Sequence, residues 1–120
     1  MVAYNYKAQF ASDVESGRKR QTIRAKRRDG RCPSPGDALQ HYTGMRTKNC
    51  RKLRDAVCSM VHDIKIKENG TVKIDGQTLG NICVEDLAKA DGFTSREPFI
   101  AFFRDTHGLP FHGDLINWSA

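Results

Sequence analysis

Residues 17–24 read Gly-Arg-Lys-Arg-Gln-Thr-Ile-Arg, and four of these eight residues are cationic. Upstream of them, Phe10 and Val14 are four residues apart, which is the spacing that places two side chains on one face of a helix. Gly17 stands where a left-handed residue closes a helix over residues 8–16. The segment therefore joins a helix end, a tight turn and the start of a strand, and the rest of the fold extends from it.

The strand in this segment places a threonine between two guanidinium groups. Arg20, Thr22 and Arg24 share one face because successive side chains alternate, and Ile23 then faces the core. Lys19 in the turn can lean over Thr22, and an amine that is desolvated and crowded by arginines has a lowered pKa. Such a lysine can act as a base toward a threonine hydroxyl. The alternative interpretation is an exposed edge strand whose charges discourage aggregation.

The clearest periodicity in the chain lies further along. Side chains over residues 54–67 alternate with a period of two, which predicts a long half-buried strand that a bulge can bend. Asn69-Gly70 predicts a type I′ hairpin turn into a strand over residues 71–74. Other strands are expected over residues 20–26, 37–43 and 114–118.

Two more helices follow the hairpin. One ends at Gly92, and the next carries Phe99, Phe102 and Phe103 in its buried stripe. No strand–helix–strand alternation recurs, which argues against a doubly wound parallel sheet. Together the elements predict one α+β domain over residues 1–120, a small mixed β-barrel of five to six strands with about three short helices.

Charge is distributed unevenly. The formal net charge is +6, but residues 1–54 carry +10 and residues 55–120 carry −4. A field of one sign on part of a small domain attracts polyanions, of which nucleic acid is the usual one, although basic runs are also found as merely solvated loops. The longest apolar run, residues 99–103, is too short to cross a bilayer, and the first residues lack the apolar stretch of a signal peptide. We therefore expect a cytoplasmic protein with no membrane partner.

Cysteine spacing gives no sign of a metal centre. Cys32, Cys50, Cys58 and Cys83 include no C-x-x-C pair, and the C-x7-C-x3-H spacing that ends at His62 matches no common zinc finger. Glycine-rich phosphate loops and the G-x-S-x-G nucleophile elbow do not occur either. The sequence predicts reduced thiols, no metal site and no cofactor.

The segment over residues 17–24 fits the pattern G-x-K-x-x-T-x-R, and it resembles the signature of the ASCH family, a relative of the PUA-like RNA-binding barrels. The resemblance continues through nearly the whole chain and is closest to the small stand-alone bacterial or phage type. Its other features are the helix before the signature, Pro35-Gly36-Asp37, Tyr42-Thr43-Gly44 with Arg46, Leu87-Ala88, Asp91-Gly92-Phe93, the aromatic helix, and Leu115-Ile116-Asn117-Trp118.

The resemblance implies a PUA-like barrel that binds RNA or a modified nucleoside in a cleft beside the signature. One branch of the family, the acetylcytidine amidohydrolases, removes an acyl group from cytidine with a lysine base, a threonine nucleophile and a glutamate. Carried over by motif position, these are Lys19, Thr22 and Asp91, where this chain has aspartate in place of the family's glutamate. The shorter side chain reaches about 1 Å less far, a displacement that can cost about a hundredfold in rate.

Three of these residues also have structural interpretations. Asp91 can assist in the cleft, or Asp91-Gly92 can be a simple turn. Arg24 is a substrate clamp or an ion-pair partner of Asp91 or Asp37. Tyr42 can stack on a base, or it belongs to the core.

The first functional hypothesis is a binding module for RNA or a modified nucleoside, with a basic cleft around residues 17–24. The second is an amidohydrolase acting on an acylated cytidine, with Thr22 as nucleophile, Lys19 as base and Asp91 assisting. A ribonuclease that uses the same cleft and an adaptor for a protein partner are further alternatives. The residues expected to contact nucleic acid are Arg18, Arg20, Arg24, Arg27, Arg28, Tyr42, Arg46 and Lys48.

Overall fold

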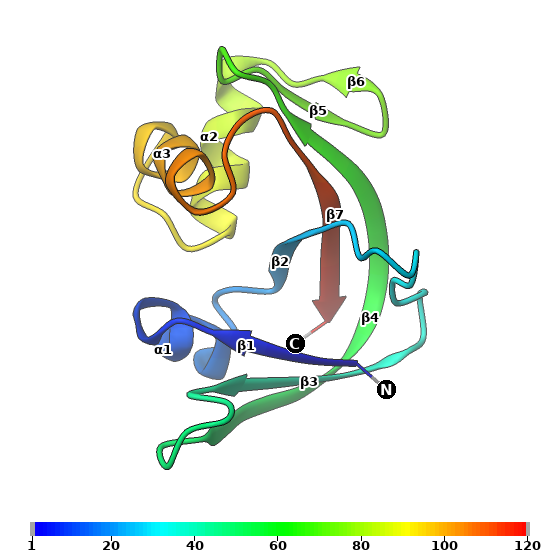
Figure 1. Cartoon of the computed structure of the whole chain (residues 1–120), viewed down its shortest axis with the longest axis vertical. Coiled ribbons are helices and arrows are strands. Elements are labelled where there is room, and N and C mark those ends of the chain that lie inside the picture. Colours follow the sequence, from blue (N-terminus) through cyan, green and yellow to red (C-terminus); the bar gives the residue numbers. More distant parts are fainter. Residues whose placement is uncertain (1, 120) are drawn as a thin grey trace.

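One seven-stranded sheet, bent along its length, carries three helices in the computed structural model, which describes residues 2–119 (Figure 1). The α+β class and the three helices confirm the expectation from sequence, and residues 2–119 form seven strands where five or six were expected. In chain order the elements are β1 (Val2–Tyr6), α1 (Ala8–Ser16), β2 (Gln21–Ala25), β3 (Ala38–Thr43), β4 (Arg51–Ile66), β5 (Val72–Ile74), β6 (Gln77–Thr78), α2 (Asn81–Ala90), α3 (Arg96–Thr106) and β7 (Phe111–Ser119).

Strand β4 organises the sheet. It pairs antiparallel with β3 at its start, with β7 along most of its length and with β5 at its end. β1 joins the sheet parallel to β3, β2 pairs antiparallel with β7, and β6 pairs with β5. Among the described residues no ladder joins β1 to β2, so the sheet is not closed into a barrel.

The curvature of β4 has a local cause. The register against β7 shifts between Cys58 and Met60, and the register against β3 shifts between His41 and Tyr42. Such bulges bend a strand and increase its twist, and Figure 1 shows β4 curving along the whole length of the molecule. The first bulge also explains why Met60 is 49% exposed although strict alternation would place it beside buried Cys58.

The hairpin turns differ from the prediction at one point. Gly70 has a positive φ of 87°, but Asn69 does not, so no type I′ turn forms there. Residues 67–71 join β4 to β5, and the Lys67 amide donates to the Thr71 carbonyl oxygen, which leaves residues 68–70 as the tip of the loop. Asp75 and Gly76 both have positive φ, 50° and 84°, and they form the two-residue turn between β5 and β6. The I′-like turn therefore lies one hairpin later than predicted.

Two hydrophobic clusters form the core. One lies under α2 and α3 and includes Phe99 and Phe103, and the other lies between α1 and the start of the sheet and includes Phe10 and Trp118. Phe93 and Phe102 pack against both clusters and so connect them. Within residues 2–119 no helix has the length and apolarity needed to span a membrane.

Candidate functional site

A cavity of about 260 Å³ lies at the boundary between the two hydrophobic clusters. Its lining residues include Lys19, Thr22, Arg24 and Asp91, and we call it the lysine pocket. Its walls come from β1, α1, β2, α3 and the end of α2. The three residues that the sequence singled out for catalysis thus line one pocket, although Asp91 is 72 residues from Lys19.

The floor of the lysine pocket holds a buried ion pair. Lys19 Nζ lies 3.0 Å from Asp91 Oδ1 and donates a further hydrogen bond of 2.6 Å to the Asp91 carbonyl oxygen. The two side chains are 4% and 7% exposed, and Gln21 Nε2 donates to the same carboxylate at 3.3 Å. Burial lowers the pKa of Lys19, which the Asp91 carboxylate opposes, and burial raises the pKa of Asp91. Replacing such pairs by apolar residues often stabilises a protein, which makes this pair a functional candidate.

Local geometry explains how the pair forms. Asp91 caps the end of α2, and Gly92 follows it with a φ of 100°. A Cβ at Gly92 would lie 3.0 Å from Cδ1 of Phe10, so glycine lets the α2 end approach this ring closely. Lys19 Nζ lies 5.2 Å from the centroid of the same ring. The glycine thus brings the Asp91 carboxylate to the lysine.

The Arg24 side chain reaches from β2 to β1. Its Nε donates to Thr22 Oγ1 at 2.9 Å, and its Nη2 donates to the Asn5 carbonyl oxygen of β1 at 2.9 Å. Its Cζ also lies 4.9 Å from the ring centroids of both Tyr4 and Tyr6. The ion pair that Asp91 makes is with Lys19, and Arg24 pairs with neither of the aspartates that the sequence suggested. The guanidinium is held by two hydrogen bonds and two aromatic rings.

Behind Arg24 lies a column of rings that sequence reasoning missed. His41 is 4.2 Å from Trp118 and 5.5 Å from Tyr6 between ring centroids, and its Nδ1 hydrogen-bonds the Tyr6 hydroxyl at 3.0 Å. Burial lowers the pKa of His41 to about 4 and raises those of Tyr4 and Tyr6 to about 12. The column is therefore neutral at pH 7. The alternation of Tyr4 and Tyr6 with polar residues in a short strand was the signal available in the sequence.

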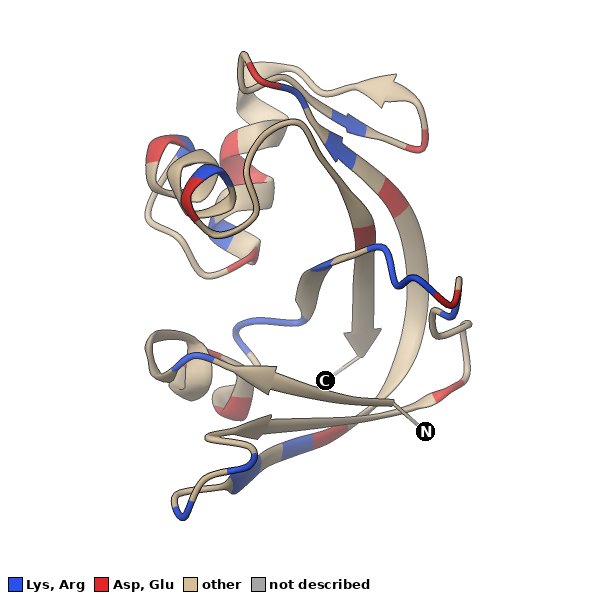
Figure 2. Cartoon of the chain, in the orientation of Figure 1, with Lys and Arg blue, Asp and Glu red and all other residues tan. Residues whose placement is uncertain are grey.

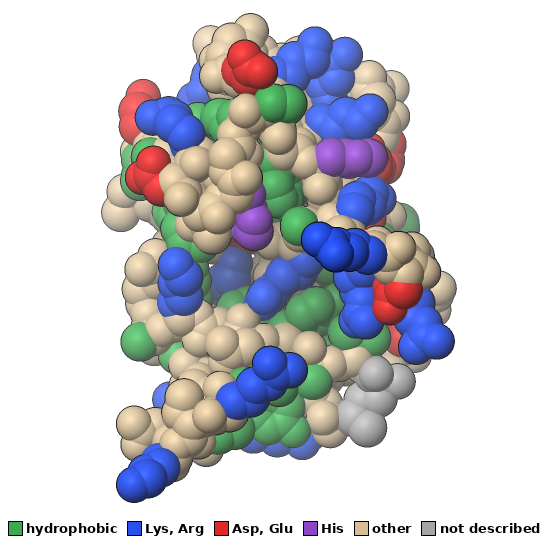
Figure 3. Space-filling model, in the orientation of Figure 1, with side chains coloured by type: hydrophobic (Ala, Val, Ile, Leu, Met, Phe, Trp, Pro, Cys, Tyr) green, Lys and Arg blue, Asp and Glu red, His purple; other side chains and the backbone are tan. Residues whose placement is uncertain are grey.

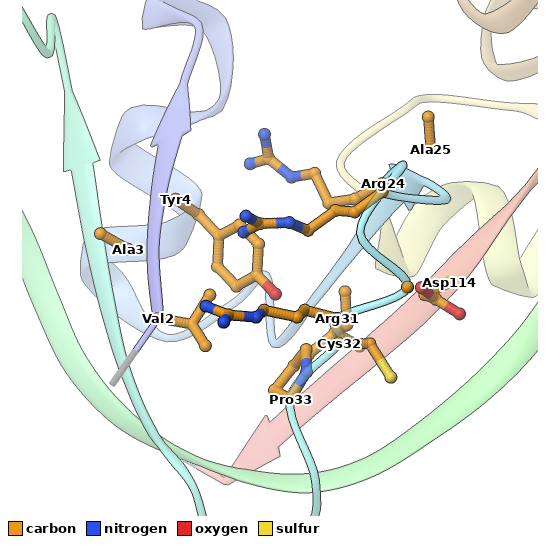
Figure 4. Close-up of a pocket in the computed structure, with 12 residues that line it drawn as sticks. Val2, Ala3, Tyr4, Arg24, Ala25, Arg31, Cys32, Pro33 and Asp114 are labelled. Atoms are coloured by element: carbon orange, nitrogen blue, oxygen red, sulfur yellow. The ribbon is translucent and has the colours of Figure 1, made fainter.

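A second, larger cavity lies on the other side of Arg24. It measures about 620 Å³, and we call it the arginine pocket after Arg24, Arg27 and Arg31, which line it together with Tyr4 and Asp114. Figure 4 shows the side chains of Arg24 and Arg31 pointing the same way, toward β1. In the space-filling view a hollow with basic side chains lies between the helices and β1 (Figure 3).

The remaining predicted contacts are spread over the surface. Arg18 and Arg20 line a separate cavity of about 540 Å³ on the outer side of the Gly17 turn. The turn between β3 and β4 is exposed and cationic (Figure 2). Tyr42 is half-buried, and its hydroxyl donates to Gln40 Oε1 at 3.2 Å. The predicted residues that line neither the lysine nor the arginine pocket are Arg18, Arg20, Arg28, Tyr42, Arg46 and Lys48.

No protein-family model, curated protein or solved structure matches this chain. The lysine pocket and the arginine pocket adjoin each other, and Arg24 lines both of them. The lysine pocket offers an amine, a hydroxyl and a carboxylate within walls that mix aromatic with polar side chains, and the arginine pocket offers guanidinium groups.

Proposed function

We propose that this protein binds RNA or a nucleoside, with the lysine pocket receiving the base. The observation that carries the proposal is the setting of Arg24, whose guanidinium is held by two hydrogen bonds and backed by Tyr4 and Tyr6. Proteins that recognise single-stranded RNA stack bases on aromatic rings or on guanidinium planes. Because Arg24 is already ordered, little conformational entropy is lost when a base stacks on it.

We also propose that the chain is an ASCH-type module on an opened PUA-like barrel. Support comes from the placement of the signature residues Lys19 and Thr22 together with Asp91 in one pocket. Further support comes from the strand edges of β1 and β2, which Arg24 connects through its hydrogen bond to Asn5. This connection lies where a closed barrel would have a backbone ladder.

Binding of a labelled single-stranded RNA of eight nucleotides, followed by fluorescence anisotropy, tests the first proposal. We expect Arg24→Ala to weaken binding by about 5- to 150-fold, because base stacking is worth about 1–3 kcal/mol. Arg104→Ala removes the same charge from an exposed position on α3 that lines neither pocket, and it should change affinity less than twofold. Circular dichroism of both variants verifies that they fold. Equal losses of RNA affinity in the two variants would mean that the RNA is bound by nonspecific charge attraction alone.

A second candidate function is hydrolysis of an acylated cytidine, favoured by the shared location of Lys19, Thr22 and Asp91. In this reaction Thr22 Oγ1 attacks the acyl carbonyl, its proton passes through the Lys19 amine to the departing cytidine nitrogen, and water then hydrolyses the acyl ester. The lowered pKa of Lys19 suits a base. The reaction requires the amine to turn from Asp91 toward Thr22, whose hydroxyl is held by Arg24.

Incubation with N4-acetylcytidine and detection of cytidine and acetate test this second function. We expect Thr22→Val to abolish product formation and Asp91→Glu, which restores the family's side-chain length, to increase it. RNA added to a parallel incubation reveals any chain cleavage and so separates a ribonuclease from an amidohydrolase. Turnover that persists in Thr22→Val would remove the threonine from the mechanism.

A further inference from the structure

The arginine pocket lies where two strand edges face each other without a ladder. β1 has β3 as its strand partner and β2 has β7, so one edge of each is unpaired within residues 2–119. Val2 and Tyr4 line the pocket from β1, and Arg24 lines it from β2. Since Arg24 also lines the lysine pocket, the two cavities are neighbours separated by one guanidinium group.

The charge of this pocket is positive and incompletely compensated. Asp114 is the acidic group among its lining residues, and its carboxylate is paired with Lys26. Arg27 pairs with Asp29 at 3.0 Å, but both side chains are substantially exposed, and exposed pairs contribute little. Within residues 2–119 the Arg31 guanidinium makes no ion pair or hydrogen bond, and it extends beside Arg24 toward β1 (Figure 4). The pocket is therefore ready to accept an anion.

The chemistry of the pocket favours a phosphate. Guanidinium groups present planar pairs of donors that match phosphate oxygens, and three such groups line one cavity. At about 620 Å³ the cavity has the size of a small-molecule site, which typically measures about 300–1,000 Å³. The carboxylates of an acidic peptide match the charge as well, but Asp and Glu side chains offer no planar ring for the guanidinium of Arg24 beside the lysine pocket.

The volume of the lysine pocket suits only one part of a nucleotide, and the adjoining arginine pocket can hold another part. The lysine pocket, at about 260 Å³, falls just below the range of about 300–1,000 Å³ that is usual for small-molecule sites. A base that enters it leaves its ribose and any attached phosphate outside. Arg24 lines both pockets, so its guanidinium lies between a base in the lysine pocket and Arg31 in the arginine pocket.

We propose that the arginine pocket is a phosphate subsite, so that the ligand is a nucleotide or an RNA chain rather than a free nucleoside. This inference rests on the proposed function and adds to it the recognition of a phosphate by Arg24, Arg27 and Arg31. The phosphate can be a terminal monophosphate or the phosphodiester of a chain, because both present the same oxygens.

Isothermal titration calorimetry tests for the phosphate subsite and distinguishes a terminal monophosphate from the phosphodiester of a chain. The ligands are the four ribonucleosides, their 5′- and 3′-monophosphates, an RNA of eight nucleotides, and an acidic peptide of matched charge. The variant is Arg31→Gln, with Arg104→Gln as the control that removes the same single charge, and Arg27→Gln/Arg31→Gln is a stronger form. All three substitutions alter exposed side chains, so the fold is expected to persist.

We expect at least one monophosphate to bind ten or more times more tightly than its nucleoside. Arg31→Gln should remove most of that advantage, leave nucleoside affinity within twofold, and lower the salt dependence of RNA binding by about one phosphate contact. A terminal phosphate is indicated if the monophosphate binds as tightly as the RNA, and a chain if the RNA binds more tightly.

Four results would overturn the inference. Equal binding of nucleoside and monophosphate would remove the phosphate subsite and leave the proposed function standing. An equal loss in Arg104→Gln would show that net charge alone acts, and an acidic peptide that binds as tightly as the best nucleotide would show that the pocket selects no phosphate. Absence of binding by every nucleoside, nucleotide and RNA would overturn the proposed function and this inference together.

Discussion

Two basic stretches of the chain have similar composition but different environments. Residues 17–31 contain eight lysines and arginines, and residues 44–54 contain five. The first stretch buries Lys19 against Asp91 and directs Arg24 from β2 to β1. The second forms an exposed turn and the start of β4, where water screens its charges (Figure 2). Charge density along the sequence therefore does not indicate which cationic side chains have altered reactivity, because their reactivity depends on their desolvation.

The largest contrast is expected between Lys19→Met and Lys48→Met. Removal of Lys19 leaves the buried Asp91 carboxylate unpaired, and we expect the free energy of unfolding at pH 7 to fall by about 3–5 kcal/mol. Lys48 is exposed, and its replacement should change stability by less than about 0.5 kcal/mol. Urea unfolding measures both.

The pH dependence of the Lys19→Met effect provides a further test of the buried ion pair. Burial raises the pKa of Asp91, so in Lys19→Met the native state binds a proton more readily than the unfolded state does. Lowering the pH from 8 to about 5 should therefore reduce the destabilisation of this variant. If Lys19→Met lowers the free energy of unfolding by less than about 1 kcal/mol at all pH values, the Lys19–Asp91 pair is effectively solvated.

The second prediction concerns His41, in the ring column behind Arg24. Its pKa is about 4 in the folded protein and 6.5 in the unfolded chain. As the pH falls from 6.5 to 4, the unfolded state takes up the proton first, so the free energy of unfolding drops by up to ~3 kcal/mol. His41→Gln should lose this part of the pH dependence. His62→Gln, a change at a partly exposed ring on β4, should retain it.

A third prediction compares two glycines with nearly the same backbone angle. Gly92 has a φ of 100° and Gly36 one of 96°, so alanine is strained at both. At Gly92 the new Cβ also meets Phe10, whereas at Gly36 no atom of residues 2–119 beyond its chain neighbours lies within 4 Å. Gly92→Ala should cost about 1–3 kcal/mol more than Gly36→Ala, because overpacking adds to the strain. Equal thermal unfolding midpoints would show that the Phe10 ring moves freely.

The smallest effect is expected at the Arg51–Glu15 ion pair, in which Arg51 Nη1 lies 2.7 Å from Glu15 Oε2 with both side chains about half exposed. A double-mutant cycle with alanine should give a coupling energy below about 1 kcal/mol, and 0.5 M salt should reduce it further. A coupling energy as large as that of Lys19 with Asp91 would contradict the difference between the two stretches.

Local pattern accounts for much of the fold. The left-handed Gly17 after α1, the long alternation that became β4, and the apolar stripe of α3 follow from spacing alone. β1 was missed because its stability comes from parallel pairing with β3, more than thirty residues away, and from the burial of Tyr6. The type I′ turn was misplaced because both Asn69-Gly70 and Asp75-Gly76 carry the same local signal.

The helices, most strands and the concentration of cations in the first half of the chain follow from the order of the residues alone, since these depend on periodicity and charge over short distances. Three features become visible only in the folded molecule: the burial of Lys19, its pairing with Asp91 in place of Arg24, and the position of Arg24 between two pockets. These features depend on desolvation and on contacts between residues far apart in the chain, and such contacts exist only after β2, α2 and β1 have come together.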